Sequence, residues 1–198
     1  MKIGFTLKPN NGNILDFEKQ LSHLEEIEAG SAEIPLYELD VISGKKIIKD
    51  ELNLLNKTIQ NSNLQFSIHG SMSVNLLDEE YLSDHLEVLR KEIEVCSALN
   101  VNILVTHFGH TPVEVSKNHQ KYKDLINIQN EEYFKIAEVA KQNGVKLCIE
   151  NIFPYTNLHF TALPSEVSKN ISEINHPNAR TTIDFSHAYI NCNLRKKD

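Results

Sequence analysis

The chain alternates short apolar runs with longer segments in which apolar residues recur at helical spacing. The segments between the runs are predicted helices, and the clearest apolar stripe consists of Leu82, Leu86, Leu89, Ile93 and Cys96. The short runs are predicted strands, and they are Lys2–Leu7, Ala32–Leu39, Gln65–His69, Asn102–His107, Lys146–Asn151 and Arg180–His187. The pattern therefore predicts regular β–α alternation.

Three further helices follow from the same spacing. One carries a stripe that begins at Phe17, one runs from Tyr122 to a stop at Asn143-Gly144, and a shorter one begins at Pro164. The segment Phe108–Gln120 is predicted to be a long loop between a strand and a helix. A loop there could be a lid, a set of substrate contacts or an ordinary surface segment.

Strict β–α alternation predicts parallel strands joined by helical crossovers. The strand starts lie 30 to 44 residues apart, close to the roughly 31 residues per unit of a (β/α)₈ barrel. A doubly wound sheet is the alternative, but the turn after the first strand, Lys8–Gly12, lacks the glycine-rich phosphate-binding pattern. We therefore expect an α/β chain that forms a single TIM (β/α) barrel domain over residues 1–198.

Only six β–α strands are visible, and the chain ends just after the sixth. We expect either a fragment of a longer protein or an open barrel with two exposed edges. Exposed parallel edges favour aggregation, which makes a fragment truncated after the sixth strand the preferred interpretation.

Composition narrows the classes of function. The net charge of −7 over 198 residues disfavours a nucleic-acid partner, although a local basic groove would remain compatible with it. The sequence contains no apolar run of about 20 residues, the length that a membrane helix needs. The three cysteines have no CxxC spacing, which disfavours disulfide and zinc-ribbon scaffolds and favours a reducing cytoplasm. The sequence does not specify an oligomeric state.

Side chains that can bind a metal stand at the ends of four successive predicted strands. His69, His107 and Glu150 end three of them, and Asp184 and His187 lie at the end of the sixth. In a barrel of this kind the carboxyl ends of the strands line the active site. Imidazole and carboxylate together suit Zn, Mn, Co or Fe, and the sequence therefore predicts a divalent-metal site.

Each of these residues also has a structural interpretation. Glu150 and Asp184 could form salt bridges in the barrel mouth, although carboxylates after apolar strands are costly to bury without a partner. His69 and His107 could be hydrogen-bonded structural residues, and His187 could pack or cap a turn. Structural or solvated roles are expected for Glu33, His110 and His159, a core position for Cys96, and no nucleophilic role for Cys148.

The set of strand-end motifs resembles the xylose-isomerase-like TIM barrel superfamily, which includes sugar and sugar-phosphate isomerases and epimerases as well as endonuclease IV. Its most specific parts here are "CIEN" at Cys148–Asn151 and "DFSH" at Asp184–His187. By this resemblance Glu150 and Asp184 are metal ligands, and His187 contacts the substrate. His69 in "HGSMSVNL" and His107 in "THFG" resemble zinc histidines of endonuclease IV. The later ligands of the family, on strands seven and eight, have no counterpart in the sequence.

The resemblance implies an isomerase or epimerase that acts on a small sugar or sugar phosphate and needs a divalent metal ion (Mn, Co, Zn, Fe or Mg). Glu150 and His187 are then the catalytic residues. The metal ligands are Glu150, Asp184, His69 and His107, and no organic cofactor is expected. Whether a proton or a hydride moves stays open. Two alternatives remain: a zinc phosphodiesterase of the endonuclease IV type acting on abasic DNA, and a truncated barrel without activity.

Overall fold

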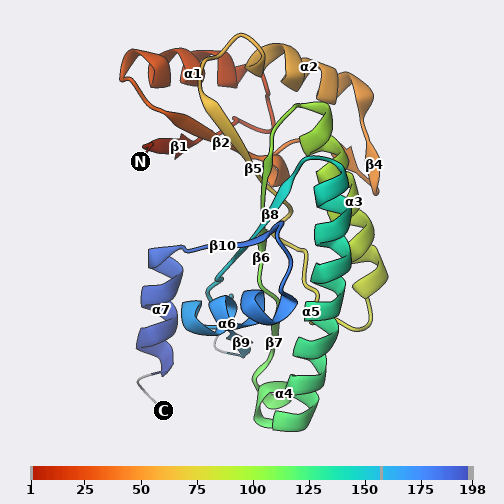
Figure 1. The fold of residues 1–198 in the computed structure, drawn as a ribbon. Helices are drawn as coiled ribbons and strands as arrows, with labels where there is room; N and C mark the ends of the chain where they lie inside the picture. Colours follow the sequence, from red (N-terminus) through yellow and green to blue (C-terminus); the bar gives the residue numbers. More distant parts are fainter. Residues whose placement is uncertain (1, 157, 196–198) are drawn as a thin grey trace.

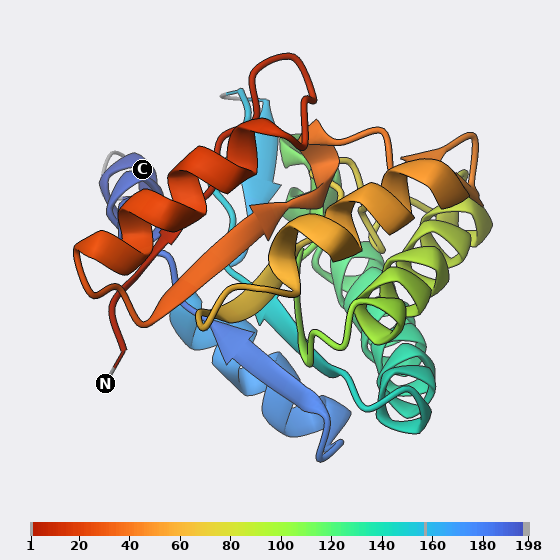
Figure 2. The same cartoon turned by 90° about the horizontal axis from the view of Figure 1, so that it is seen from above.

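The computed structural model describes residues 2–156 and 158–195, and it confirms the parallel β–α alternation. Six parallel strands form one sheet in the order β1-β2-β5-β6-β8-β10. Viewed from above, the sheet curves, and the long helices that connect its strands lie on the outside (Figure 2), while α7 stands beside the end of β10 (Figure 1). The strands are β1 (Gly4–Thr6), β2 (Ser31–Pro35), β5 (Gln65–His69), β6 (Ile103–His107), β8 (Lys146–Glu150) and β10 (Ala179–Thr182).

The predicted helices are present, and their buried apolar residues face the sheet. They are α1 (Asp16–Glu26), α2 (Lys49–Ile59), α3 (Leu82–Ala98), α5 (His119–Gln142) and α6 (Pro164–Ile174). A further helix, α7 (Phe185–Arg195), is not among those that the sequence predicts, and its large apolar side chains Phe185 and Tyr189 are exposed. On α3 the stripe residues Leu89, Ile93 and Cys96 are completely buried. Cys96 is therefore a core residue, as its position on the stripe predicts.

Two predicted strands are shorter in the structure than the apolar pattern indicates. The prediction Ala32–Leu39 is wrong beyond Pro35, where a 3₁₀ helix, η1 (Leu36–Glu38), begins. The prediction Arg180–His187 is wrong beyond Thr182, because α7 begins at Phe185. The Asp184 carboxylate accepts a hydrogen bond from the His187 backbone N–H at 2.8 Å, and a cap of this kind favours a helix start over a continued strand.

The prediction of a loop over Phe108–Gln120 is also wrong, because this segment contains regular secondary structure. Strand β7 (His110–Pro112) pairs antiparallel with β9 (His159–Thr161), and the short helix α4 (Val113–Lys117) follows. A second two-stranded ribbon is the hairpin of β3 (Ile42–Ser43) and β4 (Lys46–Ile47), which lies between β2 and α2. Both ribbons are too short to give a period-two pattern that can be recognised in the sequence.

The sheet is open in the part of the chain that the structure describes. There β1 pairs only with β2, β10 pairs only with β8, and the two edge strands do not pair with each other. Large apolar side chains near both edges are exposed, Phe5 at 49% on one side and Phe185 at 83% on the other. Over residues 2–156 and 158–195, no helix is both long and apolar enough to cross a membrane.

One carboxyl group is buried beneath the apolar stripe of α3. Glu92 is only 1% exposed, and the described residues offer its Oε2 atom no hydrogen-bond partner. Burial raises the pKa of this carboxyl from 4.5 to about 7, although a hydrogen bond from the Ser71 backbone N–H lowers it in part. The folded protein therefore holds the Glu92 proton more tightly than the unfolded chain does.

Measuring the stability of Glu92→Gln over a range of pH tests whether the folded protein raises the pKa of Glu92. Because the folded-state pKa is raised, wild type has its full stability below about pH 4.5 and loses stability as the pH rises through about 7. The glutamine variant does not titrate, so its stability relative to wild type should increase between pH 5 and pH 8 by up to about 3 kcal/mol. Urea unfolding at each pH measures the difference. Glu94→Gln, on the exposed face of α3, is the control; parallel pH profiles for Glu92→Gln and wild type would contradict the prediction.

Candidate metal centre

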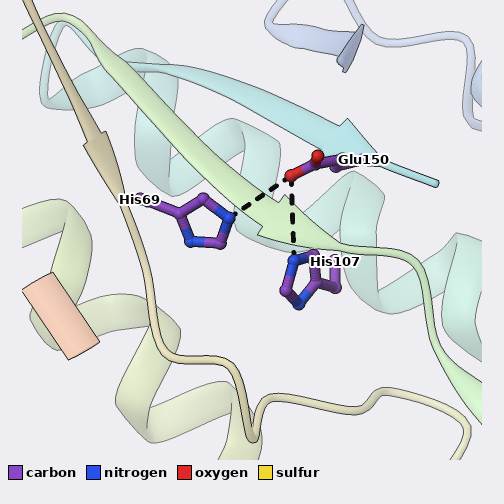
Figure 3. Close-up of side chains that lie close together, drawn as sticks. All are labelled: His69, His107 and Glu150. Carbon is purple, nitrogen blue, oxygen red and sulfur yellow. Dashed lines mark ion pairs between the residues drawn. The ribbon is translucent and has the colours of Figure 1, made fainter. Parts of the chain in front are cut away.

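Three of the predicted ligands meet at the carboxyl ends of adjacent central strands. His69 ends β5, His107 ends β6 and Glu150 ends β8, and His107 and Glu150 are register partners in the parallel sheet. Glu150 Oε2 lies 3.3 Å from His69 Nε2 and 3.7 Å from His107 Nε2. Figure 3 shows both rings turned toward this single carboxylate. The sequence-based expectation that these strand ends share one rim is correct.

A second set of ligands includes the same glutamate. Glu150, Asp184 and His187 have ligand atoms within 4.8 Å of one another, as do His69, His107 and Glu150. His187 Nδ1 lies 3.8 Å from Glu150 Oε1, and His187 Nε2 lies 3.8 Å from Asp184 Oδ2. Glu150 therefore presents one oxygen to each set, and the other four predicted site residues lie around it.

Backbone carbonyl groups orient two of the three imidazoles. His69 Nδ1 lies 3.0 Å from the carbonyl oxygen of Gly70, and His187 Nδ1 lies 2.9 Å from that of Asn151. A carbonyl oxygen can only accept a hydrogen bond, so Nδ1 carries the hydrogen in both rings. In a neutral ring this leaves the Nε2 lone pair free, and in both residues Nε2 faces a carboxylate. This is the usual arrangement of a histidine that binds a metal through Nε2.

His107 differs, because neither of its ring nitrogens has a hydrogen-bond partner among the described residues. The side chain is only 1% exposed. Burial, with the nearby His69 as a second cause, lowers the pKa of His107 to about 4 despite the opposing charge of Glu150. At neutral pH this ring is uncharged, and its buried nitrogens lack the partners that buried polar atoms normally have.

The charge state of His69 follows from opposing effects. Burial alone would lower the pKa of His69, but the hydrogen bonds to Glu150 and Gly70 and the charges of Glu33 and Glu150 together raise it. The raised pKa favours the protonated form of His69, whose Nε2 faces the Glu150 carboxylate. This ion pair is the structural role that the sequence left open for Glu150.

These residues fit a divalent cation. The set combines two carboxylates with three imidazoles, two of which are hydrogen-bonded to backbone carbonyls through Nδ1, and the nitrogens of His107 have no hydrogen-bond partner among the described residues. Such a donor set suits Zn, Mn, Fe or Co, and it is less typical of Mg, which prefers oxygen ligands.

Asn151 organises the second set of ligands, a role that the sequence did not reveal. Its side-chain amide donates to the carbonyl oxygen of Asp184 and accepts from the Asp184 backbone N–H, both at 2.9 Å. Asn151 is completely buried. The paired bonds fix the end of β8 to the start of α7, so that Asp184 and His187 face Glu150. An amide following a strand-end glutamate is too common a pattern to predict this role.

Helix α7, which carries His187, is anchored further along by Asn191. The buried Asn191 side chain donates to the carbonyl oxygen of Ile152 at 2.7 Å and accepts from the Thr161 hydroxyl at 2.9 Å. Arg195 extends the attachment by donating to the carbonyl oxygen of Thr161 and pairing with Glu166. These contacts tie α7 to the segment after β8 and to β9.

Four other residues weighed in the sequence lie outside both sets of ligands. Glu33 accepts a hydrogen bond from the Thr6 hydroxyl at 3.0 Å. His110 and His159 stack edge to face with ring centroids 5.0 Å apart on the β7–β9 ribbon. Cys148 is partly buried, and burial raises the pKa of its thiol, which disfavours a nucleophilic role.

Comparison with solved structures places the fold among sugar epimerases. A D-tagatose 3-epimerase-like protein superposes with a TM-score of 0.71 at 19% identity, over 95% of this chain and 66% of that one. A D-allulose 3-epimerase from Methylomonas sp., solved with D-allulose, gives 0.72 at 16% identity over 96% and 65%. The E. coli 3-keto-D-glucoside 4-epimerase gives 0.69 at 16% identity over 96% and 70%. At these identities the likeness shows the fold alone, and this chain spans about two thirds of the length of these proteins.

No protein of curated function matches the sequence. The xylose isomerase-like TIM barrel family, in contrast, matches residues 21–196, which include every element from β2 onward and all five clustered residues, Glu150 among them. The chain therefore belongs to the xylose isomerase-like TIM barrel family.

Proposed function

We propose that this protein is a metal-dependent isomerase or epimerase of a small sugar or sugar phosphate. The observation that carries the proposal is the meeting of His69, His107 and Glu150 at three adjacent strand ends, where the nitrogens of buried His107 find no hydrogen-bond partner in the part of the chain that the structure describes. The epimerases among the structures of similar fold support the choice of reaction.

The side chains around Glu150 have the chemistry that such a reaction needs. A bound divalent cation would act as a Lewis acid that polarises a sugar carbonyl and acidifies the neighbouring C–H. Glu150 is the general base that takes this proton, because its carboxylate is buried and lies among the ligands. Asp184, fixed by Asn151, holds the cation. His187 keeps Nε2 free and accepts a hydrogen bond from a substrate hydroxyl.

Metal content tests the site directly. Wild type, Glu150→Gln and the double variant Glu150→Gln/Asp184→Asn are equilibrated with equal concentrations of Mn, Co, Fe and Zn, dialysed, and measured by mass spectrometry. Wild type should retain about one equivalent, and the double variant should retain less than a tenth of that, because it has lost both carboxylate charges. Glu94→Gln, which changes an exposed carboxylate, should bind like wild type. A wild-type protein that unfolds cooperatively but retains no metal would contradict the proposal and favour the inactive barrel.

The reaction is tested in D₂O with a panel of ketohexoses, aldohexoses and their phosphates. Proton transfer through Glu150 should introduce deuterium at the carbon next to the carbonyl, whereas direct transfer of hydrogen between carbons should not. Glu150→Gln should lower the rate by at least about 100-fold, since a carboxamide cannot accept the proton. Nuclear magnetic resonance of the sugars follows both the product and the label. A variant that keeps the wild-type rate would show that another group is the base.

One observation favours a second candidate, a two-metal phosphodiesterase. Glu150 presents one oxygen to each of two sets of ligands, and a bridging carboxylate of this kind is compatible with a pair of cations acting on a phosphate ester. The acidic net charge of −7 disfavours a DNA substrate.

The number of metal ions distinguishes the two candidates. The isomerase should bind about one equivalent of metal, and the phosphodiesterase two or more. His107→Ala and His187→Ala change one set of ligands each, so in a two-metal protein each variant should keep about half of the metal. Two equivalents in wild type, together with cleavage of an abasic oligonucleotide, would replace the isomerase with the phosphodiesterase.

A further inference from the structure

We propose that Glu92 is a positioning residue that orients His69 for metal binding through the peptide bond between Gly70 and Ser71. The inference rests on the proposed metal site. Glu92 lies on α3, outside both sets of ligands.

The two ends of one peptide unit connect Glu92 to His69. The Ser71 N–H donates to Glu92 Oε1 at 2.5 Å, and the Gly70 carbonyl oxygen of the same unit accepts from His69 Nδ1 at 3.0 Å. A peptide unit is planar, so a fixed N–H direction also fixes the direction of the carbonyl group. Glu92 therefore determines where the acceptor for His69 Nδ1 lies.

The position of this acceptor decides which ring nitrogen is available. With the hydrogen of the neutral ring held on Nδ1, the lone pair is on Nε2. Nε2 faces Glu150 Oε2 at 3.3 Å, at the centre of the site. If the peptide turned, the hydrogen could move to Nε2, and the lone pair would point away from Glu150. A carboxylate often accepts a hydrogen bond from the ring nitrogen of a histidine that does not bind the metal. Here a peptide unit lies between the Glu92 carboxyl group and the His69 ring.

The packing around Gly70 fits this role. A Cβ atom at Gly70 would lie 2.6 Å from Glu92 Oε2 and 2.9 Å from its Cδ, so the carboxyl group rests directly on the Gly70 backbone. Glu92 is 1% exposed, and its neighbour Ile93 on α3 is completely buried. Since an apolar residue would avoid the cost of burying a carboxyl, the hydrogen bond to Ser71 is the specific gain that a glutamate provides here.

Substitutions of similar size separate the hydrogen bond from packing. Glu92→Leu removes the acceptor, Glu92→Gln keeps it, and Glu94→Leu is the control on the exposed face of the same helix. Zinc and cobalt affinities are measured by competition with a chelator. We expect Glu92→Leu to bind about 10-fold more weakly than wild type, and Glu92→Gln and Glu94→Leu to bind within about twofold of it. Glu92→Met takes the place of Glu92→Leu if the leucine variant does not fold.

The tautomer of His69 provides a readout without metal. The ¹⁵N shifts of the ring, assigned with His69→Gln, should show hydrogen on Nδ1 in neutral His69 of wild type and Glu92→Gln, and a mixture of tautomers in Glu92→Leu. Wild-type affinity and tautomer in Glu92→Leu would overturn the inference, as would equal loss of affinity in the leucine and glutamine variants. If wild type binds no metal while the tautomer still depends on Glu92, the proposed function fails and the role of Glu92 in orienting His69 stands.

Discussion

The buried carboxylate of Glu150 is the constraint on which the rest of the site depends. It is 6% exposed, and within the described residues its ion-pair partners are His69, His107 and His187, with no lysine or arginine among them. A carboxylate removed from water requires compensation by hydrogen bonds and positive charge. Three imidazoles give this only in part, because burial holds the pKa of His107 near 4 and keeps that ring neutral. Asp184 adds a second carboxylate to the same cluster. A divalent cation bound there, as we propose, would compensate both carboxylates.

The sequence predicts most of this arrangement, because it follows from topology. In parallel strands joined by helices, every strand end faces the same rim, so His69, His107 and Glu150 could be placed together before any coordinates were known. Their adjacency then depends only on register, which pairs His107 with Glu150. Asp184 and His187 were placed correctly near the rim but on the wrong element. The apolar residues Ile183 and Phe185 continue a strand-like pattern, whereas the Asp184 cap starts a helix.

What the sequence could not show are contacts between side chains and backbone. Glu92 is a charged residue beside the apolar stripe of α3, which suggests a surface position, but its carboxyl group packs on Gly70 and accepts a hydrogen bond from the Ser71 N–H. Asn151 follows a strand like many other asparagines, and its two bonds to Asp184 require the exact spacing of β8 and α7. Hydrogen bonds of this type leave no periodic signal, because their partners are 21 and 33 residues away. The sequence therefore predicts the five side chains that cluster around the strand ends, but not Glu92 and Asn151, which contact them through the backbone.

The two sets of ligands differ in how they are supported. His69, His107 and Glu150 stand on β5, β6 and β8, and each of these strands is paired on both sides. Asp184 and His187 follow β10, an edge strand in the described sheet, and depend on Asn151 and Asn191 for their position. Central strands are held by two ladders of hydrogen bonds, so the first set is rigid whatever lies beside β10. The positions of Asp184 and His187 instead depend on buried amide side chains that connect α7 to the segment after β8. In the proposed metal site, Glu150 thus joins a ligand set supported by the central strands to a set supported by these amide hydrogen bonds.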